Sequence, residues 1–252
     1  MAHLQKRHKQ IFIKPVKRLI KPASRKKPTY AFQREAFLSD EGHAQEVCQI
    51  RNLINYTKTS GSPYDATKFP AGYQTINIEG LNLKGKRDPQ ARLKDVPFDF
   101  TGKTVLDMGS NQGGMLFALA DKIKSGVGVD YDHRMVNVAN RIADYANHGH
   151  INFYVLNLEK EDLALIEDLL PSQKVDIVFL LAVCAWVKNW RDVIGAAAHI
   201  SDNLLFESNG VPEQQESQIE ELKRQFKTVQ LIRQNSVDDP EHQNRSLYFC
   251  VK

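Results

Sequence analysis

The sequence predicts an α/β protein built on a doubly wound, mostly parallel sheet, and three observations carry this prediction. From Thr101 onward, short apolar segments alternate with segments whose apolar residues recur at helical spacing. Residues 175–182 are almost wholly apolar, which is typical of a central parallel strand covered on both faces. A glycine-rich turn at residues 109–114 follows the first strand of the series, where open α/β sheets bind ligands.

Seven strands are expected in this sheet, joined by helices with right-handed crossovers. The strands are expected at residues 103–108, 126–130, 151–156, 175–182, 203–207, 229–233 and 246–251. The helices are expected at residues 113–123, 133–146, 162–170, 192–200 and 214–226.

Pattern and composition divide the chain into three parts. Residues 1–29 are expected to form a flexible basic arm, in which three prolines discourage a continuous helix. Residues 30–92 form a helical and lid segment, with helical spacing to about residue 57 and short strands after a Gly/Pro break. Residues 93–252 form the α/β domain.

The charge of the chain is unevenly distributed. The net charge is +4, but residues 1–35 contain eleven Lys or Arg and one acid, so this stretch carries +10 and the remainder −6. Such a segment indicates a polyanionic partner, RNA or an anionic membrane surface, with a solvated tail as the alternative.

Cysteine and hydropathy patterns argue against several classes of protein. The three cysteines lack C-x-x-C spacing and the eight histidines are scattered, so we expect neither a disulfide framework nor a metal site. No run of about 18 apolar residues predicts a transmembrane helix. The expected location is the cytoplasm, with the basic arm able to rest on the inner membrane surface.

Residues 105–114 read Val-Leu-Asp-Met-Gly-Ser-Asn-Gln-Gly-Gly, a buried strand that runs through a glycine-rich turn into a helix. Glycines let a ligand approach the main chain closely. Asp130 ends the next strand, 130 − 109 = 21 residues after Gly109. This matches the spacing of about 20 residues at which a carboxylate binds ribose hydroxyls.

The arrangement resembles class I S-adenosylmethionine-dependent methyltransferases, which are Rossmann-like, and in particular bacterial members of uncertain substrate. The pattern Asp107-x-Gly109-x-Asn111-x-Gly113 is similar to the first motif of that family, which often has glycine in place of Asn111. An acid two residues before the first glycine favours this cofactor over a nicotinamide dinucleotide. The resemblance covers about residues 90–252 and implies that the last two strands form an antiparallel hairpin.

The resemblance also implies a set of cofactor-binding residues. They are Asp107, Gly109, Ser110, Asn111, Gly113, Asp130, Asn157, Leu158 and Leu181.

Candidate residues for the acceptor side follow later strands or precede the first. Glu207 is the first candidate for a general base, with His133 and Asp192 as alternatives, and a buried structural role for Glu207 stays open. Trp186 is a candidate to stack on a base or sugar, and packing is the alternative. Arg87 and Arg92 are candidates to bind a phosphate or carboxylate of the acceptor, and a solvated turn is the alternative.

Three functions remain open for the unknown acceptor. The first is O-methylation of a small molecule, a saccharide or a glycolipid, since residues 181–190 lack the [N/D]-P-P-[Y/F] signature of methylases that act on amino groups. The second is methylation of RNA, with the basic arm bound to phosphates. The third is a non-catalytic protein on a degenerate methyltransferase fold.

Overall fold

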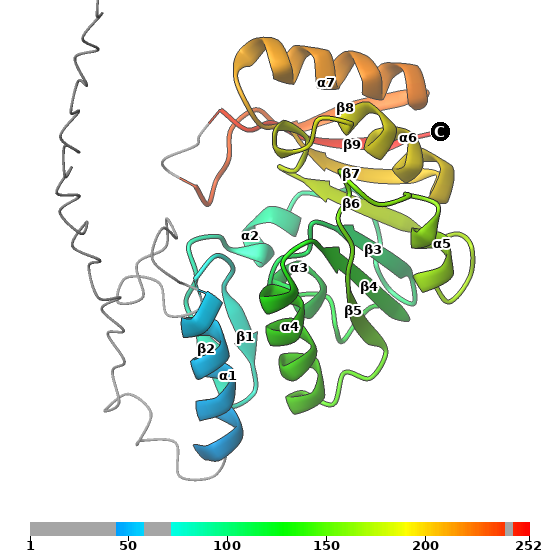
Figure 1. Cartoon of the computed structure of the whole chain (residues 1–252). Helices are drawn as coiled ribbons and strands as arrows, with labels where there is room; N and C mark the ends of the chain where they lie inside the picture. The colour runs from blue at the N-terminus through cyan, green and yellow to red at the C-terminus, as the bar shows by residue number, and fades with distance from the viewer. Residues whose placement is uncertain (1–43, 58–71, 240–243) are drawn as a thin grey trace, which may run out of the picture.

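A computed structural model of the chain describes residues 44–57, 72–239 and 244–252 (Figure 1). The predicted basic arm and the first part of the predicted helical segment lie outside these residues. The described part has the predicted α/β architecture, in which a seven-stranded sheet has the order β5-β4-β3-β6-β7-β9-β8. Its strands are β3 (Thr104–Met108), β4 (Ser125–Asp130), β5 (Ile151–Val155), β6 (Ile177–Leu181), β7 (Asn203–Glu207), β8 (Thr228–Arg233) and β9 (Leu247–Val251).

The sheet is wound in two directions from its centre. Strands β3 to β7 are parallel, and β9 runs antiparallel to both of its neighbours, β7 and β8. This confirms the C-terminal hairpin. The chain proceeds from β3 outward through β4 to β5, then returns to the other side of β3 for β6 and β7. The switch point therefore lies between β3 and β6, and ligands bind at the carboxyl ends of the strands there.

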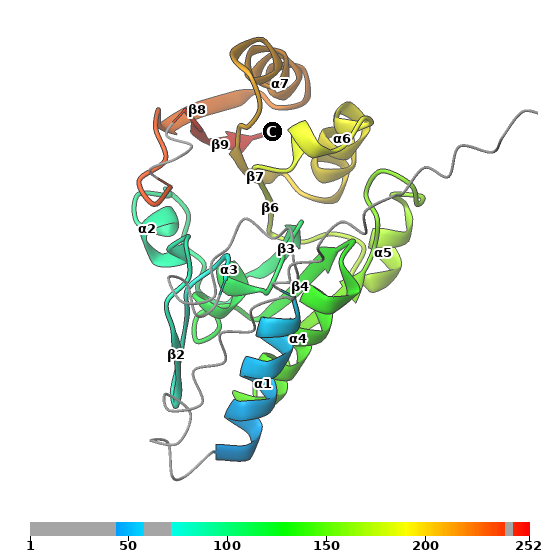
Figure 2. The same ribbon diagram turned by 60° about the vertical axis from the view of Figure 1, so that its left-hand side comes forward.

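Helices cover both faces of the sheet because successive strand residues point to opposite sides. In β6, Phe179 and Leu181 pack in the cluster that contains α1, α3 and α4, whereas Val178 and Leu180 pack in the cluster that contains α5, α6 and α7. In both views α1 lies alongside α4 (Figures 1 and 2). The helices are α1 (Ala44–Thr57), α2 (Pro89–Leu93), α3 (Gly114–Phe117), α4 (His133–Tyr145), α5 (Leu165–Leu169), α6 (Trp190–Ile200) and α7 (Pro212–Gln225), with a 3₁₀ turn η2 (Cys184–Trp186).

The helix predicted at residues 113–123 is the largest departure from expectation. Helix α3 spans only Gly114–Phe117, and a series of turns replaces the rest. From there Leu119 N donates to Leu116 O and Ala120 N to Phe117 O, so these hydrogen bonds join residues three apart, although Ile123 N again donates to Leu119 O, four residues back. The apolar spacing persists while the backbone tightens, which periodicity alone does not reveal.

The segment ahead of the α/β domain is built into it. A small hairpin pairs β1 (Ile76–Ile78) with β2 (Leu81–Leu83). The residues before and after it, Gln74 and Arg87, form an isolated bridge. Asp88 caps α2, and Pro89 begins that helix. Arg233 of β8 donates to Ala91 O at 2.7 Å and to Arg92 O at 2.6 Å, which ties α2 to the C-terminal hairpin.

Two kinds of feature are absent from the described residues. Within residues 44–57, 72–239 and 244–252, no helix is both long enough and apolar enough to cross a bilayer. The same residues contain no cluster of three or more His, Cys, Asp or Glu side chains arranged to hold a metal ion.

Candidate active site

The glycine-rich turn after β3 is shaped by residues in the left-handed region. Gly113 has φ of 81°, and a Cβ placed there would lie 2.4 Å from the Phe153 ring, so only glycine fits. Asn111 has φ of 51°, a conformation that asparagine adopts more readily than most residues. This explains how asparagine stands where the resemblance leads us to expect glycine.

Every backbone amide of this turn already has an acceptor within the protein. These bonds run from Gly109 N and Ser110 N to Val129 O, from Asn111 N to Asp130 Oδ2, from Gln112 N to Asn111 Oδ1, from Gly113 N to Ser110 O and from Gly114 N to Gln74 Oε1. The turn therefore has no spare backbone amide to offer a phosphate group, which binds to such amides in dinucleotide-binding folds.

Buried side-chain oxygens at the turn, by contrast, lack partners. Within the described part of the chain, Asp107 Oδ2, Ser110 Oγ and Gln112 Oε1 are buried and have no hydrogen-bond partner. Burial raises the pKa of Asp107 to about 7. Buried acceptors without donors are costly, so the site favours a ligand that brings ammonium or hydroxyl groups.

Asp130 lies beside the turn, as the sequence predicts. Its Oδ2 accepts from Asn111 N and its Oδ1 from Asp132 N, both at 2.9 Å, and burial raises its pKa. Each carboxylate oxygen keeps a second lone pair for a diol. Tyr131, the next residue, is 71% exposed and offers an aromatic face; the sequence analysis missed it, although an aromatic residue directly after the strand's acid was the available signal.

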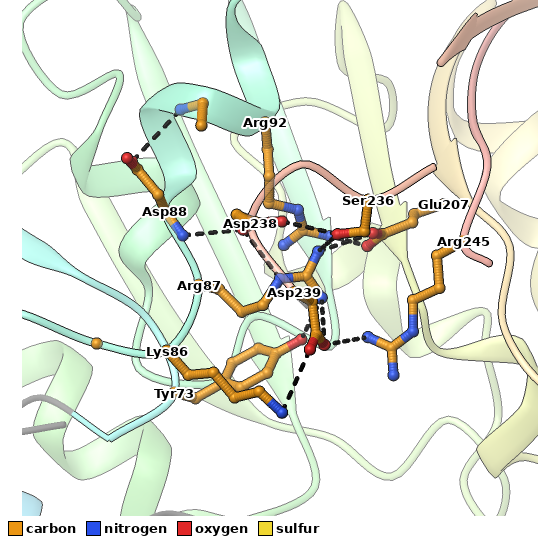
Figure 3. Close-up of polar contacts among 12 residues, drawn as sticks. Tyr73, Lys86, Arg87, Asp88, Arg92, Glu207, Ser236, Asp238, Asp239 and Arg245 are labelled. Carbon is orange, nitrogen blue, oxygen red and sulfur yellow. Dashed lines mark hydrogen bonds and ion pairs between the residues drawn. The ribbon is translucent and has the colours of Figure 1, made fainter. Parts of the chain in front are cut away.

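Glu207, Arg87 and Arg92 come together at the carboxyl end of β7 (Figure 3). Arg87 Nη2 donates to Glu207 Oε1 at 2.7 Å, and Arg92 Nη2 donates to Glu207 Oε2. Arg87 is fully buried, so the expected alternative of a solvated turn is wrong at this position. Both oxygens of Glu207 are occupied by guanidinium groups, whereas His133 and Asp192, the alternative bases, are exposed.

Two further acids that the sequence analysis missed complete this cluster. Arg87 Nε donates to Asp238 Oδ2 at 2.9 Å, and Lys86 Nζ lies 3.3 Å from Asp239 Oδ1. Burial alone lowers the pKa of Arg87, but the facing Glu207 carboxylate, Tyr73 and Asp238 outweigh it and raise that pKa. No local pattern indicated this, since Arg87 and Asp238 are 151 residues apart.

Arg92 connects the acidic cluster to the glycine-rich turn. It is 3% exposed, and its Nε is a buried donor without a partner among the described residues. Its charge also acts on Asp107, where it opposes the effect of burial on the pKa. Arg92 therefore ion-pairs with Glu207 and also acts electrostatically on Asp107, whose Oδ2 has no hydrogen-bond partner.

The remaining predicted residues also follow strands at this edge of the sheet. Asn157 and the buried Leu158 follow β5, and Leu158 O accepts from Asn189 Nδ2 at 2.8 Å. Leu181 ends β6 opposite Glu207 in the register.

The two tryptophans near the end of β6 differ in exposure. Trp186 is 76% exposed, whereas Trp190 is partly buried against the core. Asn209 fixes the turn that carries Trp186, because its side chain donates to Ala182 O at 2.8 Å and accepts from Ala185 N at 2.9 Å. Cys184 is buried, which raises its pKa to about 12 and is consistent with a packing residue.

Comparison with known proteins places this geometry in context. A family model described as "Methyltransferase domain" matches residues 99–244. The N-terminal domain of EvdMO1, crystallised in the presence of SAH and D-fucose, has a TM-score of 0.58 at 13% identity, over 88% of this chain and 98% of that one. None of the curated proteins compared with the chain matches it.

Two larger chains share the fold. WbdD, in its co-crystal structure with the kinase inhibitor LY294002, has a TM-score of 0.57 at 19% identity, over 80% of this chain and 47% of that one. A second EvdMO1 structure has a TM-score of 0.57 at 14% identity, over 81% of this chain and 47% of that one. The chain therefore spans about half the length of these two proteins.

Proposed function

The chain belongs to the methyltransferase-domain family and uses S-adenosylmethionine, and from this premise we propose that it methylates a hydroxyl oxygen of a saccharide, a glycolipid or another small molecule. The observation that carries the choice of cofactor is the balance of donors and acceptors at the turn. All amides of residues 109–114 are used internally, while Asp107 and Ser110 keep unpaired acceptor oxygens. A diphosphate would find no free backbone amide in residues 109–114, whereas an ammonium group and hydroxyls would find the unpaired side-chain oxygens of Asp107 and Ser110.

Each part of the cofactor has a residue suited to it. We assign the ribose hydroxyls to Asp130 and the ammonium group to Asp107, because both are carboxylates at the carboxyl edge of the sheet. Tyr131 offers an aromatic face for the adenine, and Asn157, Leu158 and Leu181 are assigned to the same pocket. S-adenosylmethionine supplies a methyl group on a sulfonium centre, already activated for displacement.

The acceptor side works chiefly by positioning. When this cofactor is bound, a bond from the acceptor oxygen to the methyl carbon would replace the carbon–sulfur bond, and the hydroxyl proton would pass to solvent. Glu207 is held by two guanidinium groups, so we assign it the role of an anchor for Arg87 and Arg92 rather than that of a general base. With so good a leaving group, alignment of acceptor and methyl carbon supplies most of the rate.

Trp186 and Arg92 are the proposed contacts to the acceptor. The exposed indole of Trp186 suits the apolar face of a sugar ring. Arg92 keeps a buried Nε–H without an acceptor, which suits an oxygen of the bound acceptor. The presence of D-fucose with the EvdMO1 domain supports testing sugars first.

Titration calorimetry of the full chain with S-adenosylmethionine and with S-adenosylhomocysteine (SAH) tests the cofactor. Labelled methyl transfer onto D-fucose, other sugars, glycolipid extract and RNA then tests the acceptor class. We expect micromolar binding and label on a sugar-containing acceptor. Absence of binding would favour the degenerate, non-catalytic alternative, and label on RNA alone would replace the saccharide proposal.

For the basic arm we propose an anionic partner, either RNA or a membrane surface. Residues 1–35 carry a net charge of +10, which favours an anionic partner. Replacing Lys and Arg of residues 1–29 with Gln in the full chain should abolish liposome flotation if the arm binds lipid, or salt-sensitive RNA retention if it binds RNA. Unchanged behaviour in both assays would leave the arm without either role.

A further inference from the structure

The side chain of Gln74 reaches the glycine-rich turn from outside the α/β domain. It is 2% exposed, and its Oε1 accepts from Gly114 N at 2.7 Å, although the two residues are 40 positions apart. Gly114 begins α3, directly after the turn. Gln74 therefore supplies the acceptor for the amide at which the turn becomes a helix.

The two residues fit each other closely. A Cβ built on Gly114 would lie 2.7 Å from Gln74 Cβ and 2.8 Å from its Oε1, so the space that a side chain would take is filled by the glutamine. The backbone of Gln74 is fixed in turn, because Thr75 N donates to Arg87 O at 2.8 Å and Arg87 N donates to Tyr73 O at 2.7 Å. The backbone on either side of Gln74 is thus fixed by Arg87, which is buried and ion-paired with Glu207 and Asp238.

Three anchors set the shape of the turn. At its start, Val129 O accepts from the amides of Gly109 and Ser110; in its middle, Asp130 accepts from Asn111; at its end, Gln74 accepts from Gly114. The first two anchors belong to the neighbouring strand β4. The third comes from a segment that precedes residues 99–244, the part matched by the family model.

We propose that Gln74 is a positioning residue for cofactor binding, which holds the end of the glycine-rich turn in place for the ligand. The proposal rests on the proposed function, since it presumes that the turn binds S-adenosylmethionine. Without Gln74, the buried Gly114 amide lacks an acceptor and the turn shifts to find one. A turn that must approach its ligand closely loses affinity when it shifts.

Isosteric variants of the full chain test this role by titration with SAH. Gln74→Met keeps the size and removes the acceptor, and we expect binding weaker by about tenfold. Gln74→Glu keeps an acceptor oxygen and should bind within about threefold of wild type. Gln225→Met is the matched control, since the side chain of Gln225 donates to Glu221 within α7, away from the turn, and its affinity should not change.

A second measurement separates positioning from a general loss of stability. Amide hydrogen exchange at Gly114 should accelerate in Gln74→Met and stay slow in Gln74→Glu and in Gln225→Met. Gln74→Asn, whose shorter side chain does not reach Gly114, replaces Gln74→Met should the latter fail to fold, with the same expectation.

The outcomes distinguish this inference from the proposed function. Wild type that fails to bind SAH defeats the proposed function and the inference together. Wild type that binds, with Gln74→Met or Gln74→Asn binding equally well or exchanging equally slowly at Gly114, overturns the inference and leaves the function standing.

Discussion

Arg87 and Glu207 are 120 residues apart in the chain, yet Arg87 Nη2 and Glu207 Oε1 lie 2.7 Å apart with both side chains almost wholly buried. Buried charges are tolerated only when they are fully compensated. Arg92 and Asp238 provide that compensation, one on each side of the pair. The pair thereby joins the leading segment to the end of β7.

Glu207→Gln should lower the free energy of unfolding by about 3 kcal/mol, because one neutral amide cannot compensate two buried guanidinium groups. Urea unfolding of the full chain measures this. Glu213→Gln, an exposed acid at the start of α7, is the control and should change stability by less than about 0.5 kcal/mol. A Glu207→Gln protein with native stability but no turnover would instead favour the role of general base.

Cofactor affinity should depend on pH through Asp107, whose pKa burial raises to about 7. The ammonium group needs the carboxylate, so below this pH binding must displace a proton. We expect the Kd for SAH to rise by about tenfold for each pH unit below about 7 and to level off above it. Calorimetric titrations from about pH 5.5 to about pH 8.5 follow this.

Asp107→Asn provides the control for that dependence. Its binding should be weaker than that of wild type and flat over the same pH range, and a slope that survives this substitution would exclude Asp107. The raised pKa also determines the direction in which the stability of the ligand-free protein changes with pH. The contribution of Asp107 to stability is fully present below its unfolded value of 3.8 and is lost as pH rises to about 7.

Asp130→Ala should weaken SAH binding by about tenfold to a hundredfold, since ribose hydroxyls lose a charged acceptor and Asn111 N loses its partner. Calorimetry measures the loss. Asp132→Ala is a close control, because the Asp132 side chain bonds to Arg134, and the hydrogen bond to Asp130 comes from the Asp132 backbone amide, which the substitution keeps. Equal affinities in Asp130→Ala and wild type would refute the assigned role.

Trp186→Ala should reduce methyl transfer to a saccharide acceptor while leaving SAH affinity unchanged. The indole is 76% exposed, so its loss should alter stability by less than about 0.5 kcal/mol. Labelled methyl transfer at saturating cofactor measures the effect. Trp190→Phe keeps an aromatic side chain against the core and should transfer normally; equal activity in Trp186→Ala would remove that residue from the acceptor site.

Local pattern predicted the parts of the site that lie close together in sequence. The strand ending at Met108, the turn after it and the acid at Asp130 form one βαβ unit, so spacing alone fixes their relation. The alternation of strands and helices likewise predicted the parallel sheet, and the resemblance predicted the terminal hairpin.

Long-range partners were beyond reach of the same reasoning. In the sequence Arg87 is part of a basic turn, because the three acids with which it ion-pairs lie 120 or more residues later. Gln74 reads as one polar position in a short strand, and nothing in its neighbourhood points to Gly114. Such contacts depend on how the elements pack, which neither periodicity nor composition encodes.

The leading segment sets a practical limit on how the chain can be cut. A fragment that begins at residue 93, where the predicted domain starts, would lack Arg87 and Arg92 and leave Glu207 buried without a cation. It would also lack Gln74 at the first amide of α3. Expression of this fragment alone should therefore yield insoluble or unfolded material. The smallest part of the chain that folds by itself should begin no later than residue 72.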